Sequence, residues 1–477
     1  MVNYEGVIGL EVHIQLKTKS KMFCSCAASY GALPNTQVCP VCLGMPGTLP
    51  VINKTAIEYA MKLALALNAK INLESQFARK NYFYPDLPKG YQISQFEIPL
   101  ARDGYVRLGK KTVRIREIHL EEEAGKSIHD SAHDCTLVDY NRCGVPLIEI
   151  VTEPDMNSSD EAYAFLHKIK QLAEYLDITT GNMQEGALRW DVNVSIRKPG
   201  EIESGARHEI KNMNSFRFAV KAIDYEIESQ SKTRKSGQKI THQTMLYNEA
   251  ENITRPMRVK EGADDYRYFP EPDLPPLIID EKRLGDIRRA LTELPETKHR
   301  RFIADYNLRD DQALALISTR QLADYFEATV EAKADSNLAA NWIINECPRE
   351  MKEGDLSALT VMPSSLAELM NAIESEEISA KAAKDVFAEM LKSGKSPREI
   401  IEKSNLTQIS DRAYLRKIIE KVLSESEDNI KLYLSGKTGL FGYFVGEAIK
   451  ATEGKANPKI VNELLTELLS EIKDSNA

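Results

Sequence analysis

Leu10-Glu-Val-His-Ile-Gln-Leu16 decides the fold of this chain, because apolar and polar residues alternate along its whole length. Successive side chains of a β-strand point to opposite faces of a sheet. The pattern therefore predicts a strand with its four apolar residues toward a core and with Glu11, His13 and Gln15 on the other face. A carboxylate beside an imidazole suits a divalent metal ion, although a polar strand face more commonly just faces water.

The part of the chain that follows predicts a mixture of strands and helices. Strands are expected at 7–16, 112–120, 145–151 and 188–197. A capping box at Ser158 and Glu161 predicts one helix, and Asn214-Ser215 precede a second. The polar segment 229–240 has no periodic pattern and is expected to be an exposed loop, whereas the prolines of 266–276 exclude a helix there.

From about residue 293 the pattern changes to helices separated by short breaks, with a further break between 394 and 408. A length of 477 residues is compatible with about three domains. We therefore expect an α+β protein with a mixed N-terminal domain, a helical domain and a small helical tail domain, at 1–292, 293–405 and 406–477.

Composition and charge restrict the class of protein. The chain is 42% hydrophobic and 28% charged, as in ordinary globular proteins. No apolar run reaches the roughly 18 residues of a membrane span, and the N-terminus resembles neither a signal peptide nor a transit peptide. We expect a cytoplasmic protein with no membrane partner. The net charge of −9 argues against a broadly cationic nucleic-acid-binding surface, so a nucleic-acid partner would need a local basic patch.

Four of the seven cysteines form two close pairs, Cys24 with Cys26 and Cys39 with Cys42. Two such pairs across a short loop are typical of tetrahedral zinc coordination by thiolates, and labile disulfides or reduced thiols are the alternative. Four protein ligands leave no open position, so the zinc of this insert at 24–42 would be structural. The remaining cysteines are expected to be isolated buried thiols: Cys135, Cys143 and Cys347.

Further carboxylates accompany the first strand. Glu149 interrupts an apolar run, so it should be paired with a cation, a metal or a proton, or form a structural salt bridge to a buried arginine. Glu121, Glu122 and Glu123 follow another predicted strand and repel one another unless a cation gathers them, or they form a solvated acidic turn. Brought together with Glu11 and His13, these oxygens and one imidazole would suit Mg²⁺ or Mn²⁺ better than zinc.

Two other segments offer polar or charged ligands. Asp191, Asn193 and Ser195 alternate along one face of the strand predicted at 188–197, which offers metal, hydroxyl and phosphate ligands but could equally lie in water. In the segment that contains Lys80 and Tyr82, a base could stack on an aromatic ring while the lysine meets phosphate. The Gly-Lys-Ser/Thr sequences near 127 and 438 lack the glycine that a phosphate loop places five residues earlier.

The tail carries a basic stretch in an otherwise acidic chain. Residues 431–459 hold five lysines and two glutamates, a net charge of +3. Such a stretch could contact an RNA backbone, although a solvated helix end is the simpler interpretation.

Several motifs of the chain closely resemble the B subunit of aspartyl/glutamyl-tRNA amidotransferase. The resemblance covers essentially the whole sequence, including the tail. It rests on Gly9-Leu-Glu-Val-His13, Arg79-Lys-Asn-Tyr-Phe-Tyr-Pro-Asp86, Tyr91-Gln-Ile-Ser-Gln-Phe96, Glu121-Glu-Glu-Ala-Gly-Lys-Ser127, Pro146-Leu-Ile-Glu149, Asp264-Asp-Tyr-Arg-Tyr-Phe-Pro-Glu-Pro-Asp273 and Gly454-Lys-Ala-Asn-Pro458.

The resemblance implies a ligase that takes part in protein biosynthesis and uses ATP and Mg²⁺. It implies phosphorylation of the side chain of glutamate or aspartate misacylated on tRNA(Gln) or tRNA(Asn), followed by amidation with ammonia from the amidase (A) subunit of the complex. The small (C) subunit would complete the heterotrimer. The family fold is a cradle-like α+β domain, a helical domain and a tail that grips tRNA, and its zinc-bearing members carry the cysteine quartet.

Site residues are assigned by the same resemblance. Glu11, His13, Glu122 and Glu149 would be catalytic and hold Mg²⁺, with Glu121 as a further ligand. Lys80, Tyr82, Asp191, Asn193 and Ser195 would bind the nucleotide, and Lys211 and Asn212 would meet an anion just before a helix start. In the tail, tRNA contacts are expected from Lys437, Lys450 and Lys455.

Two alternatives belong to other classes of protein. A non-catalytic zinc-ribbon RNA-binding protein would need no acidic metal site, and a metal-dependent hydrolase would turn over without ATP or partner chains. The recurrence of acidic side chains and imidazole on three predicted strands favours the amidotransferase.

Overall fold

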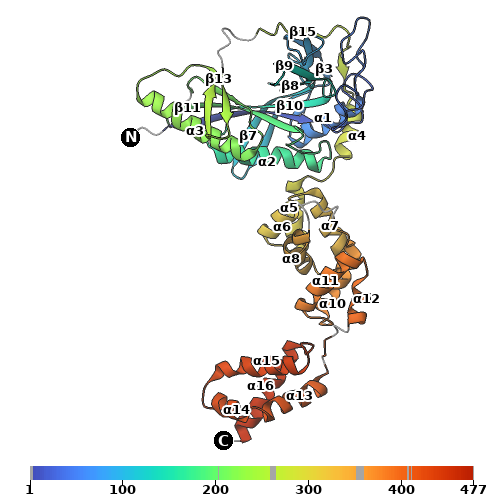
Figure 1. Ribbon diagram of the computed structural model, residues 1–477, viewed down its shortest axis with the longest axis vertical. Coiled ribbons are helices and arrows are strands. Elements are labelled where there is room, and N and C mark those ends of the chain that lie inside the picture. The colour runs from blue at the N-terminus through green and yellow to red at the C-terminus, as the bar shows by residue number, and fades with distance from the viewer. Residues whose placement is uncertain are drawn as a thin grey trace. The chain divides into compact units, whose positions relative to one another are not determined.

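The chain folds into two compact units, Met1–Pro295 and Glu296–Ala477 (Figure 1). The structure, a computed structural model, describes residues 4–130, 132–201, 204–257, 265–350, 359–404, 408–409 and 411–475. Both Asp264 and the domain boundary expected at 405–406 lie outside these residues. The first unit combines sheets with helices and the second is helical, which confirms the predicted α+β class.

A nine-stranded sheet organises the described part of the first unit. All its neighbouring strands are antiparallel except β12 and β13. In spatial order the strands are β14 (Ile253–Pro256), β13 (Gln243–Asn248), β12 (His208–Lys211), β11 (Leu188–Arg197), β1 (Glu5–Gln15), β10 (Pro146–Thr152), β7 (Lys111–Glu122), β6 (Ala101–Leu108) and β2 (Lys70–Ile71). The four strands expected from the sequence are thus β1, β7, β10 and β11.

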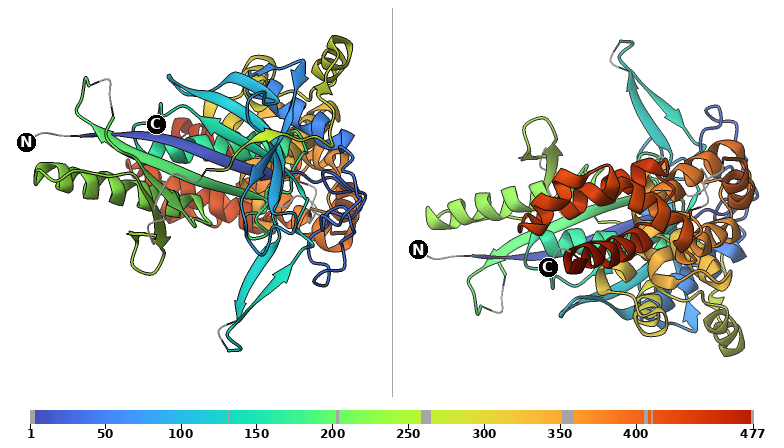
Figure 2. Two further views of the ribbon diagram at one scale, coloured as in Figure 1. Left: turned by 90° about the horizontal axis from the view of Figure 1, so that it is seen from above. Right: turned by 90° about the horizontal axis from the view of Figure 1, so that it is seen from below.

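Smaller sheets accompany the main one. A three-stranded sheet contains β15 (Phe269–Pro270), β4 (Phe77–Asn81) and β5 (Tyr91–Gln95). A two-stranded pair joins β16 (Leu277–Ile278) to β3 (Glu74–Ser75). The strands β8 (Lys126–Asp130) and β9 (Cys135–Asp139) form a hairpin that extends away from the main sheet (Figure 2).

One face of the main sheet is apolar and packs against helices α1 (Lys54–Ala66), α2 (Ser159–Tyr175) and α3 (Phe216–Lys235) (Figure 1). Strand residues such as Val12, Ile150 and Val192 are buried there together with Phe165 of α2 and Ile223 of α3. Burial of each such side chain contributes about 1.5–3 kcal/mol, so this face holds the unit together. The alternation of the strands leaves their polar residues on the opposite face.

Helix α3 corrects one expectation from the sequence, because 229–235 belongs to it and not to an exposed loop. The helix begins directly after Asn214-Ser215, as predicted, and its N-cap is Ser215. The polar pattern concealed the helix, since Glu226 and Gln230 are polar yet lie on its buried face against the sheet. Residues 266–276 contain no helix, as the prolines indicated.

Helices account for the remaining regular structure. The first unit ends with α4 (Glu281–Arg289). The second unit contains α5 (Pro295–Tyr306), α6 (Asp310–Leu316), α7 (Arg320–Glu331), α8 (Ser336–Asn345), α9 (Cys347–Glu350), α10 (Pro363–Glu374), α11 (Ala380–Ser393), α12 (Pro397–Ser404), α13 (Arg412–Ser424), α14 (Glu427–Leu434), a 3₁₀ turn η3 (Thr438–Leu440), α15 (Phe441–Ala451) and α16 (Pro458–Ser475). Within the described residues, no helix is both long and apolar enough to cross a bilayer.

Two hydrophobic clusters lie within the second unit. One contains buried residues between Phe302 and Ile401, and the other contains buried residues between Leu415 and Leu469. The second cluster includes the apolar side of the last helix, α16: Val461, Leu464, Leu465, Leu468 and Leu469. These clusters support our proposal that the helical part comprises two domains.

A buried carboxylate ties three elements of the first unit together. Glu226 of α3 is 1% exposed and accepts hydrogen bonds from Thr254 of β14 and from Gln230. Its Oε2 also lies 2.7 Å from Nδ1 of His208 in β12. Burial by itself would raise the pKa of Glu226, but the hydrogen bonds from His208, Thr254 and Gln230 lower it. Through His208, Glu226 holds β12 in place. Glu209 and Lys211 of the same strand point to the polar face of the sheet.

Substitution Glu226→Gln is expected to destabilise the first unit by about 3 kcal/mol, because the charged partner of a buried pair is removed. Chemical unfolding followed by the fluorescence of Trp190, in a Trp342→Phe background, would measure the change. The matched control is Glu228→Gln, which neutralises an exposed carboxylate on the same helix and should leave the midpoint unchanged.

The same contact predicts a dependence on pH. Because the pKa of Glu226 is lowered by folding, its contribution is present above its unfolded pKa of about 4.5 and is lost as the pH falls further. Below pH 4.5 the unfolding free energy of the wild type should therefore fall more steeply than that of the Glu226→Gln variant. Parallel curves would contradict this account.

Candidate functional site

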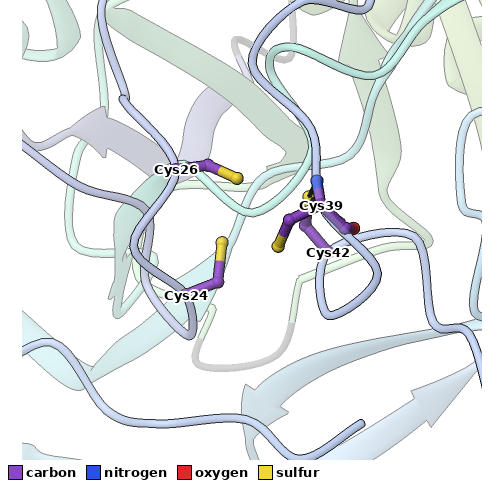
Figure 3. Close-up of side chains that lie close together, drawn as sticks. All are labelled: Cys24, Cys26, Cys39 and Cys42. Atoms are coloured by element: carbon purple, nitrogen blue, oxygen red, sulfur yellow. Dashed lines mark hydrogen bonds between the residues drawn. The ribbon is translucent and has the colours of Figure 1, made fainter.

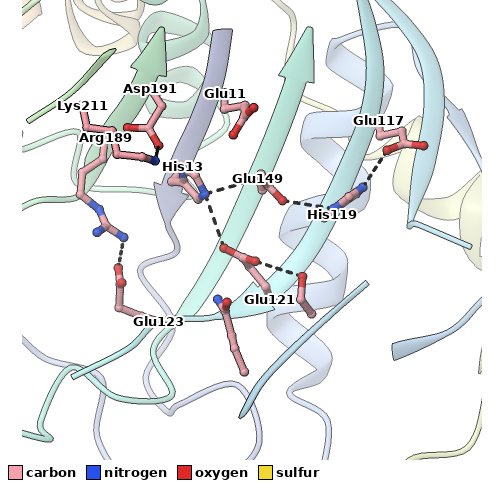
Figure 4. Close-up of polar contacts among 12 residues, drawn as sticks. Glu11, His13, Glu117, His119, Glu121, Glu123, Glu149, Arg189, Asp191 and Lys211 are labelled. Carbon is pink, nitrogen blue, oxygen red and sulfur yellow. Dashed lines mark hydrogen bonds and ion pairs between the residues drawn. The ribbon is translucent and has the colours of Figure 1, made fainter. Parts of the chain in front are cut away.

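Four side chains lie in one row across neighbouring strands on the polar face of the main sheet (Figure 4). Arg189 of β11 is opposite His13 of β1. His13 is opposite Glu149 of β10, and Glu149 is opposite His119 of β7 on its other side. The antiparallel register therefore converts residues that are far apart in sequence into a continuous line of ionisable groups.

Glu121 joins this row because it lies two residues beyond His119 on β7 and so points to the same face. The Nε2 atom of His13 lies 3.7 Å from Oε1 of Glu121 and 3.7 Å from Oε1 of Glu149. Adjacent ligands of an octahedral Mg²⁺ lie about 3.0 Å apart and opposite ligands about 4.2 Å apart. The spacing, one imidazole and two carboxylates thus fit a magnesium ion.

His119 determines the charge of Glu149. Its Nδ1 lies 3.1 Å from Glu149 and its Nε2 lies 3.2 Å from Glu117. Burial would lower the pKa of His119, but these two hydrogen bonds raise it to about 9. Burial would likewise raise the pKa of Glu149, but the hydrogen bond from His119 and the charges of both histidines lower it to about 2. The partner of Glu149 is therefore histidine and not the buried arginine considered as an alternative.

Glu11 belongs to a second group of carboxylates beside the first. Its pKa is raised by burial and then by the charges of Glu149, Asp191 and Glu209. Oxygen atoms of Glu11, Asp191 and Glu209 lie within 4.8 Å of one another. Nζ of Lys211 lies 2.5 Å from Asp191 and 2.8 Å from Glu209, so an ammonium already neutralises part of this group.

Glu209 was not among the residues expected from the sequence. The sequence pattern could have indicated it, because Glu209 and Lys211 are two residues apart on β12 and their side chains therefore share a face. Asn212, which follows Lys211, has a backbone φ of 67°. Asparagine tolerates this left-handed conformation better than most residues, and it allows the chain to turn from β12 toward α3.

Glu122 was expected to hold a metal with its neighbours, but the structure places it elsewhere. Successive residues of β7 point to opposite faces, so Glu122 points away from Glu121. Its side chain is 2% exposed, pairs with Lys89 and accepts a hydrogen bond from the backbone N–H of Ile93 at 3.0 Å. We therefore leave Glu122 out of the candidate ligand set.

A cavity of about 900 Å³ opens beside the row. Among the expected residues, it is lined by His13, Lys80, Tyr82, Glu121, Asp191, Lys211 and Asn212. Asn193 is not among the described residues that line the cavity, and its Nδ2 donates to Glu11 at 3.2 Å. Ser195 is 3% exposed and is not part of the cavity wall formed by the described residues.

Lys80 is held over aromatic rings at the cavity. Its Nζ lies 4.8 Å from the ring centre of Tyr266 and 6.0 Å from that of Tyr82. Such cation–π contacts contribute about 0.5–2 kcal/mol. The segment that carries Tyr266 is fixed to β4 by Asn81, whose backbone N–H and side-chain Nδ2 both donate to the carbonyl of Tyr266. The rings therefore place a cation near the acidic row.

A buried ion pair secures this wall of the cavity. Arg79 donates to both carboxylate oxygens of Glu271 at 2.8 Å, and Glu271 is 2% exposed. The guanidinium group also lies 4.2 Å from the ring centre of Tyr91. Arg79 is on β4 and Glu271 follows β15. The pair therefore links these two strands of the small sheet next to Lys80.

The four expected zinc ligands converge (Figure 3). The Sγ atoms of Cys24, Cys26, Cys39 and Cys42 lie within 4.8 Å of one another. Zinc–sulfur bonds of about 2.3 Å in a tetrahedron separate sulfur atoms by about 3.8 Å, so the quartet could bind zinc. A hydrogen bond from Cys24 lowers the pKa of Cys42 to about 4, and donation in this bond raises the pKa of Cys24.

The other cysteines are not all buried as expected. Cys143 and Cys347 are buried, but Cys135 is exposed because it begins the second strand of the protruding β8–β9 hairpin. The hairpin has its own two-strand ladder and lies outside the core, which the local sequence did not indicate.

The tail lysines lie in the second unit. Lys437 is exposed, and Lys450 is exposed with its Nζ 3.5 Å from Glu447. Lys455 is only partly exposed and lies 3.9 Å from Glu453. Such exposed pairs contribute little to stability, so the lysines could exchange partners with an anion at small cost.

Comparisons with known proteins place these features in context. Residues 6–285 match the family model of the GatB/GatE catalytic domain, and residues 324–469 match that of the GatB domain. The chain is 48% identical to the B subunit of aspartyl/glutamyl-tRNA(Asn/Gln) amidotransferase from Thermoanaerobacter pseudethanolicus and 49% identical to that from Solidesulfovibrio magneticus. In both cases the match covers 98% of this chain and 100% of the relative.

Substitution Arg79→Met is expected to loosen the cavity wall, because it leaves Glu271 as a buried carboxylate without its main partner, at a cost of about 2 kcal/mol. Hydrogen exchange of the amides of 266–269 should accelerate about tenfold or more. The matched control is Arg114→Met, which breaks a similar two-pronged pair with Asp155 on an exposed side chain. Unchanged exchange at 266–269 in the Arg79 variant would contradict the role of the pair.

Proposed function

The chain belongs to the family of aspartyl/glutamyl-tRNA(Asn/Gln) amidotransferase B subunits, and from this premise we propose that it activates the side-chain carboxyl group of a misacylated tRNA. The substrates would be glutamate on tRNA(Gln), aspartate on tRNA(Asn) or both. ATP would transfer its γ-phosphoryl group to the carboxylate, and ammonia would then displace phosphate to form the amide. The activation is needed because a carboxylate has no good leaving group, whereas the acyl phosphate has one.

The proposed reaction needs a partner chain that supplies ammonia. We propose that the amidase (A) subunit hydrolyses glutamine and that the small (C) subunit completes the complex in the cytoplasm. The relatives are named as one subunit of an amidotransferase, which supports a complex with further chains.

The observation that carries the proposal is the convergence of His13, Glu121 and Glu149 at the cavity that Lys80 lines. A magnesium ion held by these three residues would neutralise charge on the phosphates, which is the main requirement of phosphoryl transfer. His119 keeps Glu149 ionised as a ligand. Glu11 lies beside this group and is a candidate additional ligand.

The nucleotide would lie along the cavity wall. Lys80 offers a positive charge to phosphate, and the neighbouring ring of Tyr82 offers a surface for stacking. Asp191, Lys211 and Asn212 line the same cavity and could contact the nucleotide or the reacting carboxyl group. Asn193 would orient Glu11, and buried Ser195 would support the strand without touching a ligand.

The remaining features fit supporting roles. A zinc ion bound by the four cysteines would be structural, because no coordination position stays open for a substrate. We propose that the tail binds tRNA through lysines, including Lys437, Lys450 and Lys455. The net charge of +3 in 431–459 supports contact with phosphates.

Substitution Glu149→Gln tests the proposal. Loss of a charged magnesium ligand should lower amidation of misacylated tRNA by about 100-fold or more in the reconstituted complex, while glutamine hydrolysis by the partner chain is retained. The assay measures amidated aminoacyl-tRNA, with ATP, Mg²⁺ or each protein chain omitted in turn. Amidation that persists in the variant, or in the absence of ATP, would refute the proposed activation step.

The matched control for this experiment is Glu97→Gln. Glu97 is an exposed glutamate of the same unit that lies outside the cavity lining. Its substitution makes the same chemical change and should leave both reactions unaffected. A loss of amidation in both variants would point to instability instead of a loss of metal binding.

A further inference from the structure

Lys21 is a lysine with no exposed surface, which is an unusual environment for an ammonium group. It lies three residues before Cys24, and its backbone contacts two other segments of the chain. Its backbone N–H donates to the carbonyl of Cys26 at 2.9 Å, and its own carbonyl accepts from Asn53 at 3.2 Å. A buried ammonium costs several kcal/mol unless it is paired, so its partners should reveal its role.

The Nζ atom of Lys21 contacts the cysteine quartet. It lies 3.6 Å from Sγ of Cys42 and 3.2 Å from the backbone carbonyl of Tyr140. Among the described residues, no carboxylate lies within 4.0 Å of it. The nearby buried lysine, Lys89, differs in this respect because it pairs with Glu122. Lys21 therefore has a thiolate where Lys89 has a carboxylate.

The negative charge of a zinc–thiolate centre explains why a lysine lies beside Cys42. A zinc ion with four thiolates has a net charge of −2, which is costly to bury. The ammonium group of Lys21 offsets one of these charges, and its N–H donates directly to the sulfur of a ligand. The four cysteines would hold the zinc ion, and Lys21 would supply a positive charge next to one of their thiolates.

We propose that Lys21 is a functional member of the zinc centre, in which it balances charge and fixes the Cys42 ligand. This inference rests on the proposed zinc site. Groups that hydrogen-bond metal ligands in this way typically change metal affinity by about 10-fold to 100-fold when they are removed.

Lys21 also connects the metal centre to the cavity. Tyr140, whose carbonyl accepts from Lys21, donates its own backbone N–H to Asn35 of the cysteine loop at 2.8 Å. Asn141, the next residue, accepts from the N–H of Gln37 at 2.8 Å and lines the cavity. The cysteine loop itself contributes cavity lining at 28–32. The lysine thus joins the zinc ligand to a wall of the proposed active site.

Substitution Lys21→Met tests the inference in the full chain, because methionine keeps much of the length of the side chain but removes its charge and donors. Chelator competition should show zinc affinity lowered by about 10-fold or more. Mass spectrometry should show faster alkylation of Cys42 by iodoacetamide, since the sulfur loses its hydrogen bond. Zinc affinity within about threefold of the wild type would overturn the proposal.

Two further variants complete the test. Lys19→Met removes an exposed lysine two residues away and should leave zinc affinity unchanged. Lys21→Gln retains a donor without charge, should also weaken zinc binding by about 10-fold, and replaces the methionine variant if that variant fails to fold. Wild-type protein that binds no zinc would refute the zinc centre itself, whereas zinc-bound wild type with unaltered Lys21 variants would refute only the role of Lys21.

Discussion

The hydrogen-bonded pair of His119 and Glu149 is the interaction around which the polar face of the sheet is arranged. The side chain of Glu149 is 17% exposed, and burial makes its ionised form costly unless a cationic group lies beside it. His119 supplies that neighbour from the adjacent strand and is itself held by Glu117. An ionised Glu149 then lies beside His13 and Glu121, in a group that could hold a divalent cation.

This arrangement depends on strand register. A slip of β10 by one residue against β1 or β7 would send Glu149 to the apolar face and bring Ile148 or Ile150 to the polar one. The apolar residues that pack against the helices resist such a slip, because they would lose their burial. The core thus keeps the ligands aligned, and stability and chemistry rely on the same alternation.

Other charges on the polar face of the first unit are also paired. Lys211 pairs with both Asp191 and Glu209, while Arg189 pairs with Glu123 at the cavity edge. In the group of His13, Glu121 and Glu149, by contrast, both carboxylates lie 3.7 Å from the imidazole of His13. Lys80 differs from the other two cations, because aromatic rings hold it near the acidic groups. Such a cation can meet an anionic substrate.

Local sequence was sufficient to predict four strands of the main sheet, the starts of α2 and α3, the cysteine quartet and the shared face of Glu11 and His13. Period-two alternation and capping residues act over a few positions, so they can be read without knowledge of the fold. Motif resemblance added the family, which the comparisons then showed. The strand predicted at 112–120 ended before the three glutamates, so only the structure showed that Glu121 and Glu122 point to opposite faces of β7.

The sequence by itself determined which residues are polar, which alternate and which could bind a metal. Only the tertiary structure decided that His119 is the partner of Glu149, that Glu122 pairs with Lys89, that Glu209 joins Glu11, and that Lys21 lies against Cys42. These contacts join segments that are separated by 21 to 198 positions, from Lys21 and Cys42 to Glu11 and Glu209. Strand order and register set them, and those depend on the packing of the whole core and not on any local pattern.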